Sequence, residues 1–258
     1  MYKLLNGDCL EVIKNIPNES IDLIVTSPPY FNAREYSQWD TYDDFLKWLK
    51  EVFALTYDKL KEGRMCCVNL SVIIQPREKR SCESKRIPLP FHFVSLMESI
   101  GFKFLEDIIW VKPEGAAKNR NGGFFQHRQP VSYKPNVVNE YILVFQKPSK
   151  YLIDKIVRSY QGEIKEKSLV EDGYERSNVW YINPETKSKH PAPYPEELCE
   201  KLIKYYSYCG DIVLDMFLGS GTTGVASVKN NRNFIGIDIS EEYCEIAKER
   251  IEDIINNK

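Results

Sequence analysis

The stretch that most constrains the fold is the apolar run Leu23–Val25, which leads into the tetrapeptide Ser27-Pro28-Pro29-Tyr30. A short β-branched run bounded by turn formers is typical of a strand covered on both faces of a sheet. The strand must end at the prolines, because neither has an N–H to donate to a neighbouring strand. In addition, Pro29 excludes Pro28 from the helical region of backbone conformation. The sequence therefore predicts a rigid corner that offers a hydroxyl, a free carbonyl and an aromatic face. A stiff turn with no further role is the alternative.

A second constraint lies far downstream, between Ile212 and Asp238. A buried strand ends at Asp215, a Gly-Ser-Gly turn follows at Gly219–Gly221, and the next strand ends at Asp238, as in the first half of a nucleotide-binding βαβ unit. The glycines permit close approach to a ligand, and Asp238 can accept hydrogen bonds from ribose hydroxyls. Since the turn is not Gly-x-Gly-x-x-Gly, a dinucleotide is less favoured than a ligand with a carboxylate, and S-adenosylmethionine fits. A purely structural turn is the alternative.

Several short motifs follow one another along the chain in a fixed order. They are Gly7-Asp8-Cys9-Leu10, Thr26–Tyr30, Trp110-Val111-Lys112-Pro113, His190-Pro191-Ala192-Pro193, Gly219–Thr223 and Gly236-Ile237-Asp238. In this order they resemble the amino-methyltransferases of DNA over most of the chain. The proline tetrapeptide precedes the cofactor loop, which is similar to the permuted β group of that family. Methyltransferases that act on ribosomal RNA or on protein glutamine carry the loop first, so the order argues against them.

The resemblance implies an α/β, Rossmann-like, S-adenosylmethionine-dependent methyltransferase fold, with a mostly parallel sheet and helices on both faces. A chain of 258 residues allows one sizeable core, so we expect a single catalytic domain over residues 1–258. DNA-recognition insertions are expected at about 76–90 and 113–180. The cofactor-binding residues that the resemblance implies are Asp8, Cys9, Thr26, Pro193, Asp215, Phe217, Gly219, Ser220, Gly221, Thr222, Thr223, Asp238 and Ile239.

The resemblance assigns catalysis to Ser27, Pro28, Pro29 and Tyr30. An exocyclic amino nitrogen is a weak nucleophile, because its lone pair is delocalised into the base. We expect the Ser27 hydroxyl and the Pro28 carbonyl to accept hydrogen bonds from the two N–H groups of this amino nitrogen, while Tyr30 stacks on the base. The base must first be flipped out of the duplex. In the resembled family Ser before Pro-Pro mostly accompanies cytosine N4 and Asp or Asn mostly adenine N6, so we predict cytosine N4, with adenine N6 as the alternative.

Further alternatives are an amino-methyltransferase of RNA or a small molecule, and a cofactor-binding protein without catalysis. The formal net charge of −2 means that a polyanion must be met by local basic patches. Double-stranded DNA is the expected partner, in a restriction-modification system with an endonuclease encoded nearby, and the protein is a monomer or a homodimer. Basic segments at 76–90 and 112–134 are either solvated surface insertions or phosphate-binding loops. Their candidate DNA-binding residues are Arg77, Arg80, Lys118, Arg120 and Arg128.

Cysteine spacing and hydropathy bear on whether the protein binds a metal, is secreted or lies in a membrane. The seven cysteines form no Cys-x-x-Cys and no His pairing at ligand spacing, so free thiols and no metal site are expected. No apolar run approaches the ~20 residues that span a bilayer, and the N-terminus lacks the apolar core of a signal peptide. We therefore expect a cytoplasmic protein with no membrane partner.

Local patterns give further expectations. A helix is predicted from Thr41, with Gly63 as its end. The aromatic stretch Phe31–Trp39 is expected to close over the target nucleotide or to pack on the core. Asp8 suits a helix N-cap as well as a cofactor contact. The charged stretch Lys150–Arg176 is expected to hold part of the recognition region.

Overall fold

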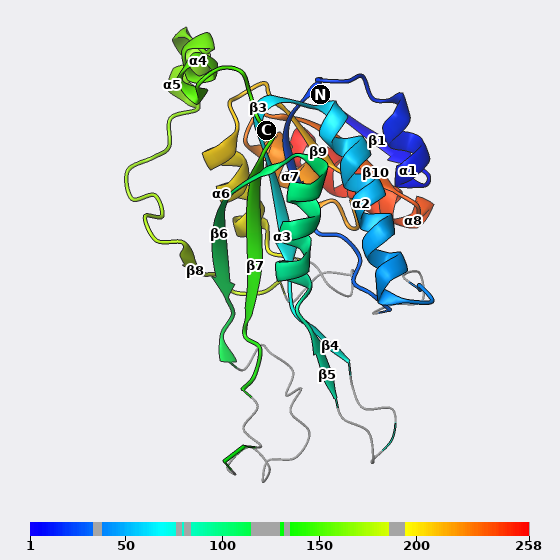
Figure 1. The fold of residues 1–258 in the computed structure, drawn as a ribbon. Coiled ribbons are helices and arrows are strands. Elements are labelled where there is room, and N and C mark those ends of the chain that lie inside the picture. The colour runs from blue at the N-terminus through cyan, green and yellow to red at the C-terminus, as the bar shows by residue number, and fades with distance from the viewer. Residues whose placement is uncertain are drawn as a thin grey trace.

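The centre of the molecule is an eight-stranded β-sheet (Figure 1). The computed structural model describes residues 1–32, 38–75, 79, 84–114, 130–131, 135–185 and 194–257. Neighbouring strands are parallel, except that β7 runs antiparallel to both β3 and β6. The expected α/β fold with a mostly parallel sheet is confirmed. From edge to edge the strands are β1 (Tyr2–Asn6), β10 (Asn233–Asp238), β9 (Ile212–Asp215), β2 (Ile21–Thr26), β3 (Leu60–Leu70), β7 (Asn139–Gln146), β6 (Lys103–Val111) and β8 (Val179–Tyr181).

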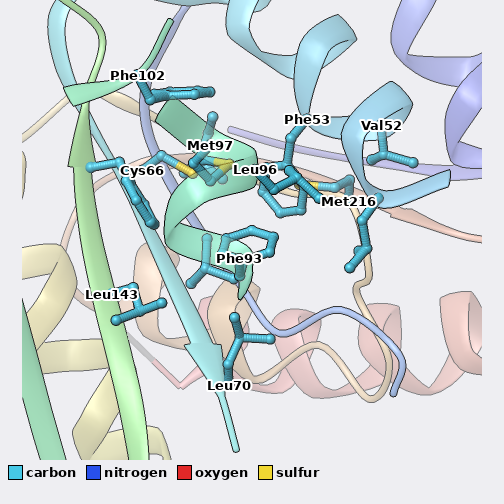
Figure 2. Packing of buried hydrophobic residues seen from close by; sticks show 14 of the residues in the cluster. Val52, Phe53, Cys66, Leu70, Phe93, Leu96, Met97, Phe102, Leu143 and Met216 are labelled. Atoms are coloured by element: carbon cyan, nitrogen blue, oxygen red, sulfur yellow. The ribbon is translucent and has the colours of Figure 1, made fainter. Parts of the chain in front are cut away.

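Helices cover both faces of this sheet. One face is covered by α1, η1, α2 and α3, and Figure 2 shows Phe93 and Met97 of α3 between that helix and β3, beside Phe53 of α2. Burying a side chain of this size contributes about 1.5–3 kcal/mol, so this layer stabilises the sheet strongly. The helices of the molecule are α1 (Cys9–Val12), η1 (Ile13–Asn15, a 3₁₀ turn), α2 (Tyr42–Lys59), α3 (Leu89–Ile100), α4 (Ile153–Ser159), α5 (Gly162–Lys167), α6 (Glu196–Tyr206), α7 (Thr222–Lys229) and α8 (Glu241–Asn256).

The opposite face is covered by α6, α7 and α8. The central strand β2 is buried along its whole length, and its side chains alternate between the two cores. Ile24 belongs to the cluster beneath α2, whereas Leu23 and Val25 belong to the cluster beneath α6 and α7. The prediction of a strand covered on both faces is therefore confirmed, and the Ser-Pro-Pro-Tyr corner starts from the middle of the sheet.

The end of α2 differs from the prediction. Thr41 caps the helix as expected, because its hydroxyl accepts the Asp44 N–H, but the helix ends at Lys59 rather than at Gly63. Leu60 instead pairs with Ile21 of β2, so the chain enters β3 directly. The register between β2 and β3 shifts just after this pair, and Gly63 supplies the positive φ of +75° in that irregular stretch. Strand pairing, which the helical pattern could not reveal, decided this boundary.

The two ends of the sheet carry different additions (Figure 1). Beyond β3 a small hairpin, β4 (Ile73–Gln75) paired with β5 (Lys85–Ile87), extends from the end of the sheet at which β6 ends and β7 begins. Helices α4 and α5 lie at the opposite end, because β7 is antiparallel to β3 and returns the chain there. The stretch Lys150–Arg176 is thus placed away from the corner at Ser27.

A buried ionic cluster fixes α4 to the amino ends of the strands. Arg64 of β3 lies 3.1 Å from carboxylate oxygens of both Asp22 and Asp211. Tyr160, directly after α4, donates to Asp211 at 2.7 Å, and its ring stacks on Tyr208 with the centroids 3.9 Å apart. Burial raises the pKa of Asp211, and the Arg64 guanidinium opposes that rise. Arg64 therefore bridges two buried carboxylates, and Lys61 also forms an ion pair with Asp22 at 2.7 Å.

Candidate active site at the carboxyl ends of β9 and β2

The loops that follow β9 and β2 leave the sheet toward opposite faces. β2 is followed by α2, which packs in the first core, while β9 is followed by α7, which packs in the second. The two strands are parallel neighbours, with Leu23 opposite Val213 and Ile24 opposite Leu214. In open α/β sheets, ligands bind beside the carboxyl ends of the strands at such a divergence. The two stretches singled out in the sequence therefore meet at the position where this fold class binds its ligands.

The corner after β2 is held by the neighbouring strand. The Ser27 hydroxyl donates to the Asn69 main-chain carbonyl of β3 at 3.2 Å. Pro28 is buried, whereas Ser27, Pro29 and Tyr30 are partly exposed. Because the single hydroxyl proton of Ser27 is directed to Asn69, the lone pairs of its oxygen are left to accept from another group.

Sequence reasoning missed the side chains behind this corner. The Asn69 amide donates to Glu140 at 2.7 Å, and Glu140 also forms an ion pair with Lys112. Glu140 can only accept, so this bond fixes the amide orientation and leaves the buried Asn69 Oδ1 without a partner in the described part of the chain. The Lys112 ammonium lies 4.5 Å from the centre of the Trp110 ring. The sequence marked Trp110-Val111-Lys112 only as a motif, and no periodic signal pointed to Asn69 or Glu140.

Asp215 lies at the end of β9 and is fully buried. Its Oδ1 accepts the Thr26 hydroxyl at 2.7 Å and the Phe217 N–H at 3.0 Å. Its Oδ2 accepts the Thr223 hydroxyl at 2.7 Å and the Tyr194 hydroxyl at 3.0 Å. Burial raises the pKa of this carboxyl, and the hydrogen bonds from Thr26 and Thr223 oppose the rise. Tyr194 was not predicted, although it directly follows the predicted Pro193.

Two side chains of the glycine-rich loop, those of Ser220 and Thr222, contact α8. Arg250 of α8 donates to the Ser220 carbonyl at 2.6 Å and reaches the hydroxyls of Ser220 and Thr222 at 3.2 and 3.3 Å. Gly221 has a φ of +81°, and a Cβ there would lie 2.5 Å from the Cβ of Ala247. The loop is therefore pressed against α8 at a position where only glycine fits, and its Gly219 N–H donates to Asp238 at 2.8 Å.

The ends of β10 and β1 complete this edge. Each Asp238 carboxylate oxygen accepts one backbone N–H, from Gly219 and from Ser240, and the side chain is partly exposed. Ile239, directly after it, is 68% exposed, so an apolar surface lies beside a carboxylate. Asp8 is exposed and caps α1 by accepting the Leu10 N–H at 2.8 Å. Cys9 is buried, which with Asp8 nearby raises its pKa to about 12, so its thiol stays protonated.

The described part of the predicted aromatic stretch packs on α2. Phe31 is buried, with its ring 5.5 Å from that of Tyr42, and Trp39 lies 4.8 Å from Phe45 and 5.1 Å from Trp48. Of the two expectations for this stretch, packing on the core fits these residues. Trp48 also contacts Phe217 of the loop after β9, with ring centroids 5.7 Å apart. The aromatic cluster thus joins the loops after β2 and β9.

Several predicted residues lie outside the described part of the chain. They are Pro193 and the candidate DNA-binding residues Arg77, Arg80, Lys118, Arg120 and Arg128. Among the described residues, Arg86 of β5 donates to the Pro135 carbonyl at 2.9 Å, which ties the hairpin to the segment that enters β7. Within the described ranges no group of three His, Cys, Asp or Glu is placed to hold a metal ion. None of the helices in those ranges combines the length and apolarity of a membrane span.

Residues 21–249 match the family model described as DNA methylase. The chain belongs to the DNA methylase family. It is 33% identical to the type II beta methyltransferase M.BslI of Bacillus sp. (strain NEB-606) over 96% of its own length, but it spans only 27% of that relative. It is 32% identical to the orphan methyltransferase M.BamHII of Bacillus amyloliquefaciens, over 94% of this chain and 92% of that one.

This family member also shares its fold with a solved structure. TTHA0409 of Thermus thermophilus, crystallised in complex with S-adenosyl-L-methionine, superposes with a TM-score of 0.80 at 27% identity. The alignment covers 100% of this methylase and 96% of TTHA0409. The similarity therefore includes the sheet, the corner after β2 and the loop after β9 together.

Proposed function

We propose that this protein is an S-adenosylmethionine-dependent DNA methyltransferase that modifies the exocyclic N4 amino group of a flipped cytosine. The observation that carries the proposal is the hydrogen bond from Thr26 to Asp215, which joins the corner at Ser27 to the loop at Gly219–Gly221. A methyl acceptor held at the corner would thereby lie beside a methyl donor held by the loop. Membership of the DNA methylase family supports DNA as the substrate.

The residues at the edge of β10 and β9 fit S-adenosylmethionine. Asp238 is partly exposed at the position that suits ribose hydroxyls, and Ile239 offers an exposed apolar surface for a purine ring. The turn at Gly219–Gly221 presents its backbone, since the hydroxyls of Ser220 and Thr222 face Arg250. When bound, the cofactor supplies an electrophilic methyl group. TTHA0409 was crystallised with this cofactor, which supports the same assignment here.

The remaining predicted cofactor residues divide into two groups on this edge. Asp8, Cys9 and Phe217 lie at loops that follow β1 and β9, and we propose that Asp8 and Phe217 border the cofactor. Gly7 donates to the Asp238 carbonyl at 2.9 Å, which brings the loop with Asp8 beside Asp238. Thr26 and Thr223 are buried with their hydroxyls on Asp215, so they act by holding the site together.

The residues of the corner act on the base by accepting hydrogen bonds from its amino group and by stacking on its ring. Ser27 and the Pro28 carbonyl accept hydrogen bonds from the two N–H groups of the amino group. This geometry favours a nitrogen lone pair that points out of the plane of the base. Tyr30 stacks on the base and fixes its plane. No residue needs to form a covalent bond, because orientation alone can contribute several kcal/mol, of the order of 7–11 kcal/mol in well-aligned intramolecular reactions. The site therefore works by alignment and hydrogen bonding.

The preference for cytosine rests on Ser27 and its partner. The Ser27 hydroxyl donates a hydrogen bond to the Asn69 main-chain carbonyl at 3.2 Å. A neutral hydroxyl therefore fits at this position, whereas a carboxylate would place its own acceptor oxygen against the Asn69 carbonyl, which is also an acceptor. We expect Ser27→Thr to retain cytosine methylation and Ser27→Asp to lose it without gaining adenine methylation. An aspartate variant that methylates adenine efficiently would show that Asn69 does not constrain this position.

DNA recognition is proposed for the additions at the carboxyl end of the sheet. We propose one catalytic domain in the permuted β arrangement, with recognition by residues 76–90 and by the β6–β7 connection, to which Arg120 and Arg128 belong. The stretch 150–176 is left out, because α4 and α5 lie at the other end of the sheet. The similarity to the type II methyltransferase M.BslI supports a role in restriction-modification.

The test is nucleoside analysis of unmethylated DNA after incubation with the purified protein and S-adenosylmethionine. N4-methylcytosine is the expected product, N6-methyladenine alone would overturn the target base, and no methylated nucleoside would overturn the function. Ser27→Ala should lower the single-turnover rate at least ~10²-fold, as for loss of an acceptor that acts in the transition state, with cofactor affinity nearly unchanged. The matched control is Ser159→Ala, whose hydroxyl bonds the Ile156 carbonyl in α4.

A further inference from the structure

Asp215 has no acceptor capacity left for a ligand. A carboxylate offers about four lone-pair sites, and Asp215 receives four protein donors, two on each oxygen, at 2.7–3.0 Å. All four donors are neutral, and the side chain is fully buried. The hydroxyls of Tyr194 and Thr223, which share Oδ2, also contact each other. These contacts argue against the direct cofactor contact that the sequence motif suggested for Asp215.

We propose that Asp215 is a positioning residue that ties the target-base corner to the cofactor loop. This role rests on the proposed function. On one side its carboxylate holds Thr26, the residue directly before Ser27. On the other side it holds Phe217 and Thr223, which flank the glycine turn. One buried group thus sets the positions of both halves of the site, although the two halves follow different strands.

The arrangement predicts that the two halves are coupled through the carboxylate. Thr26 and Thr223 donate to different oxygens of Asp215, so removing either hydroxyl leaves one oxygen with a single donor and lets the carboxylate turn. A turned carboxylate no longer orients the donor on its other oxygen. Energetic effects of residues that share one partner are non-additive, whereas effects of independent residues add.

The experiment is a double-mutant cycle on the chemical step. Thr26→Val and Thr223→Val each remove one donor from Asp215 at constant side-chain shape, and Thr56→Val is the matched control. Thr56 is also fully buried, but its hydroxyl bonds the Val52 carbonyl within α2. Single-turnover methylation is measured at saturating S-adenosylmethionine, cofactor affinity by calorimetry, and folding by urea denaturation.

We expect Thr26→Val to lower the single-turnover rate at least tenfold while the cofactor dissociation constant changes less than twofold. The double variant should lose much less rate than the product of the two single losses. Thr56→Val should affect stability only.

Three results would overturn the role of Asp215. The first is a rate for Thr26→Val equal to that of Thr56→Val, and the second is single losses that multiply in the double variant. The third is a weakened cofactor affinity at unchanged rate in Thr26→Val, which would make this threonine a cofactor contact. A wild-type protein that transfers no methyl group to DNA would instead refute the proposed function, on which this role depends.

Discussion

Replacement of Gly221 by alanine tests how the glycine-rich loop after β9 is fixed against α8. Gly221 has a φ of +81°, a region that costs a non-glycine residue about 1–2 kcal/mol. The added Cβ would also lie 2.5 Å from the Cβ and 2.9 Å from the Cα of Ala247, a clash with backbone that cannot rotate away. Overpacking of this kind costs about 1–3 kcal/mol, so Gly221→Ala should lower the free energy of unfolding by about 2–5 kcal/mol.

The structure supplies a matched control at Gly210, whose φ is +86° and whose Cβ would meet nothing within 4 Å. Gly210→Ala therefore carries only the conformational cost of about 1–2 kcal/mol. Equilibrium urea denaturation of both variants isolates the clash as their difference, expected at about 1–3 kcal/mol. Calorimetry should also show weaker S-adenosylmethionine binding for Gly221→Ala alone. Equal destabilisation of the two variants would refute the close contact between the loop and Ala247.

Three further predictions address the cofactor, the DNA and the fold. Asp238→Ala should weaken S-adenosylmethionine binding by about 1.5–3 kcal/mol, as for hydrogen bonds to a charged group, and unchanged affinity by calorimetry in a folded variant would remove Asp238 from the site. Replacing Arg120 and Arg128 by glutamine should lower DNA affinity and the salt dependence of binding while cofactor binding stays constant, because fewer counterions are released; titrations at several salt concentrations check this, and an unchanged slope would exclude both residues. Arg64→Leu should cost about 3–5 kcal/mol in urea denaturation, because it leaves the buried Asp211 carboxylate without its cation and Asp22 with Lys61 alone; Lys14→Leu, at an exposed ion pair, is the control. A loss for Arg64→Leu no larger than for Lys14→Leu would contradict the buried cluster.

Local chemistry made part of the fold predictable. The strand before Ser27 and its abrupt end follow from an apolar run and two prolines, and both occur where the pattern places them. The strand ending at Asp215 was equally predictable, because it depends on neighbours in the chain. The end of α2 was not, since Leu60 leaves the helix to pair with a strand far earlier in the chain, at Ile21.

The same division holds within the site. Motif order and the glycine turn predicted which segments would carry the chemistry, and the roles of Ser27 and Asp238 stay predictions. The assignment of Asp215 as a cofactor contact could not be judged from the motif, because its donor Thr26 is 189 positions away along the chain. Asn69 and Glu140 carried no local signal, because a single polar residue near a strand end is common.

The sequence by itself determined where strands stop, which loops are rich in glycine, and the order in which the corner and the cofactor loop occur. Those properties depend on backbone conformation and on residues a few positions apart. Only the tertiary structure decided which side chains share a hydrogen bond, which carboxylates are saturated by protein donors, and on which end of the sheet α4 and α5 lie. A hydrogen bond needs atoms within about 3 Å, and only folding brings Thr26, Asp215 and Thr223 that close together.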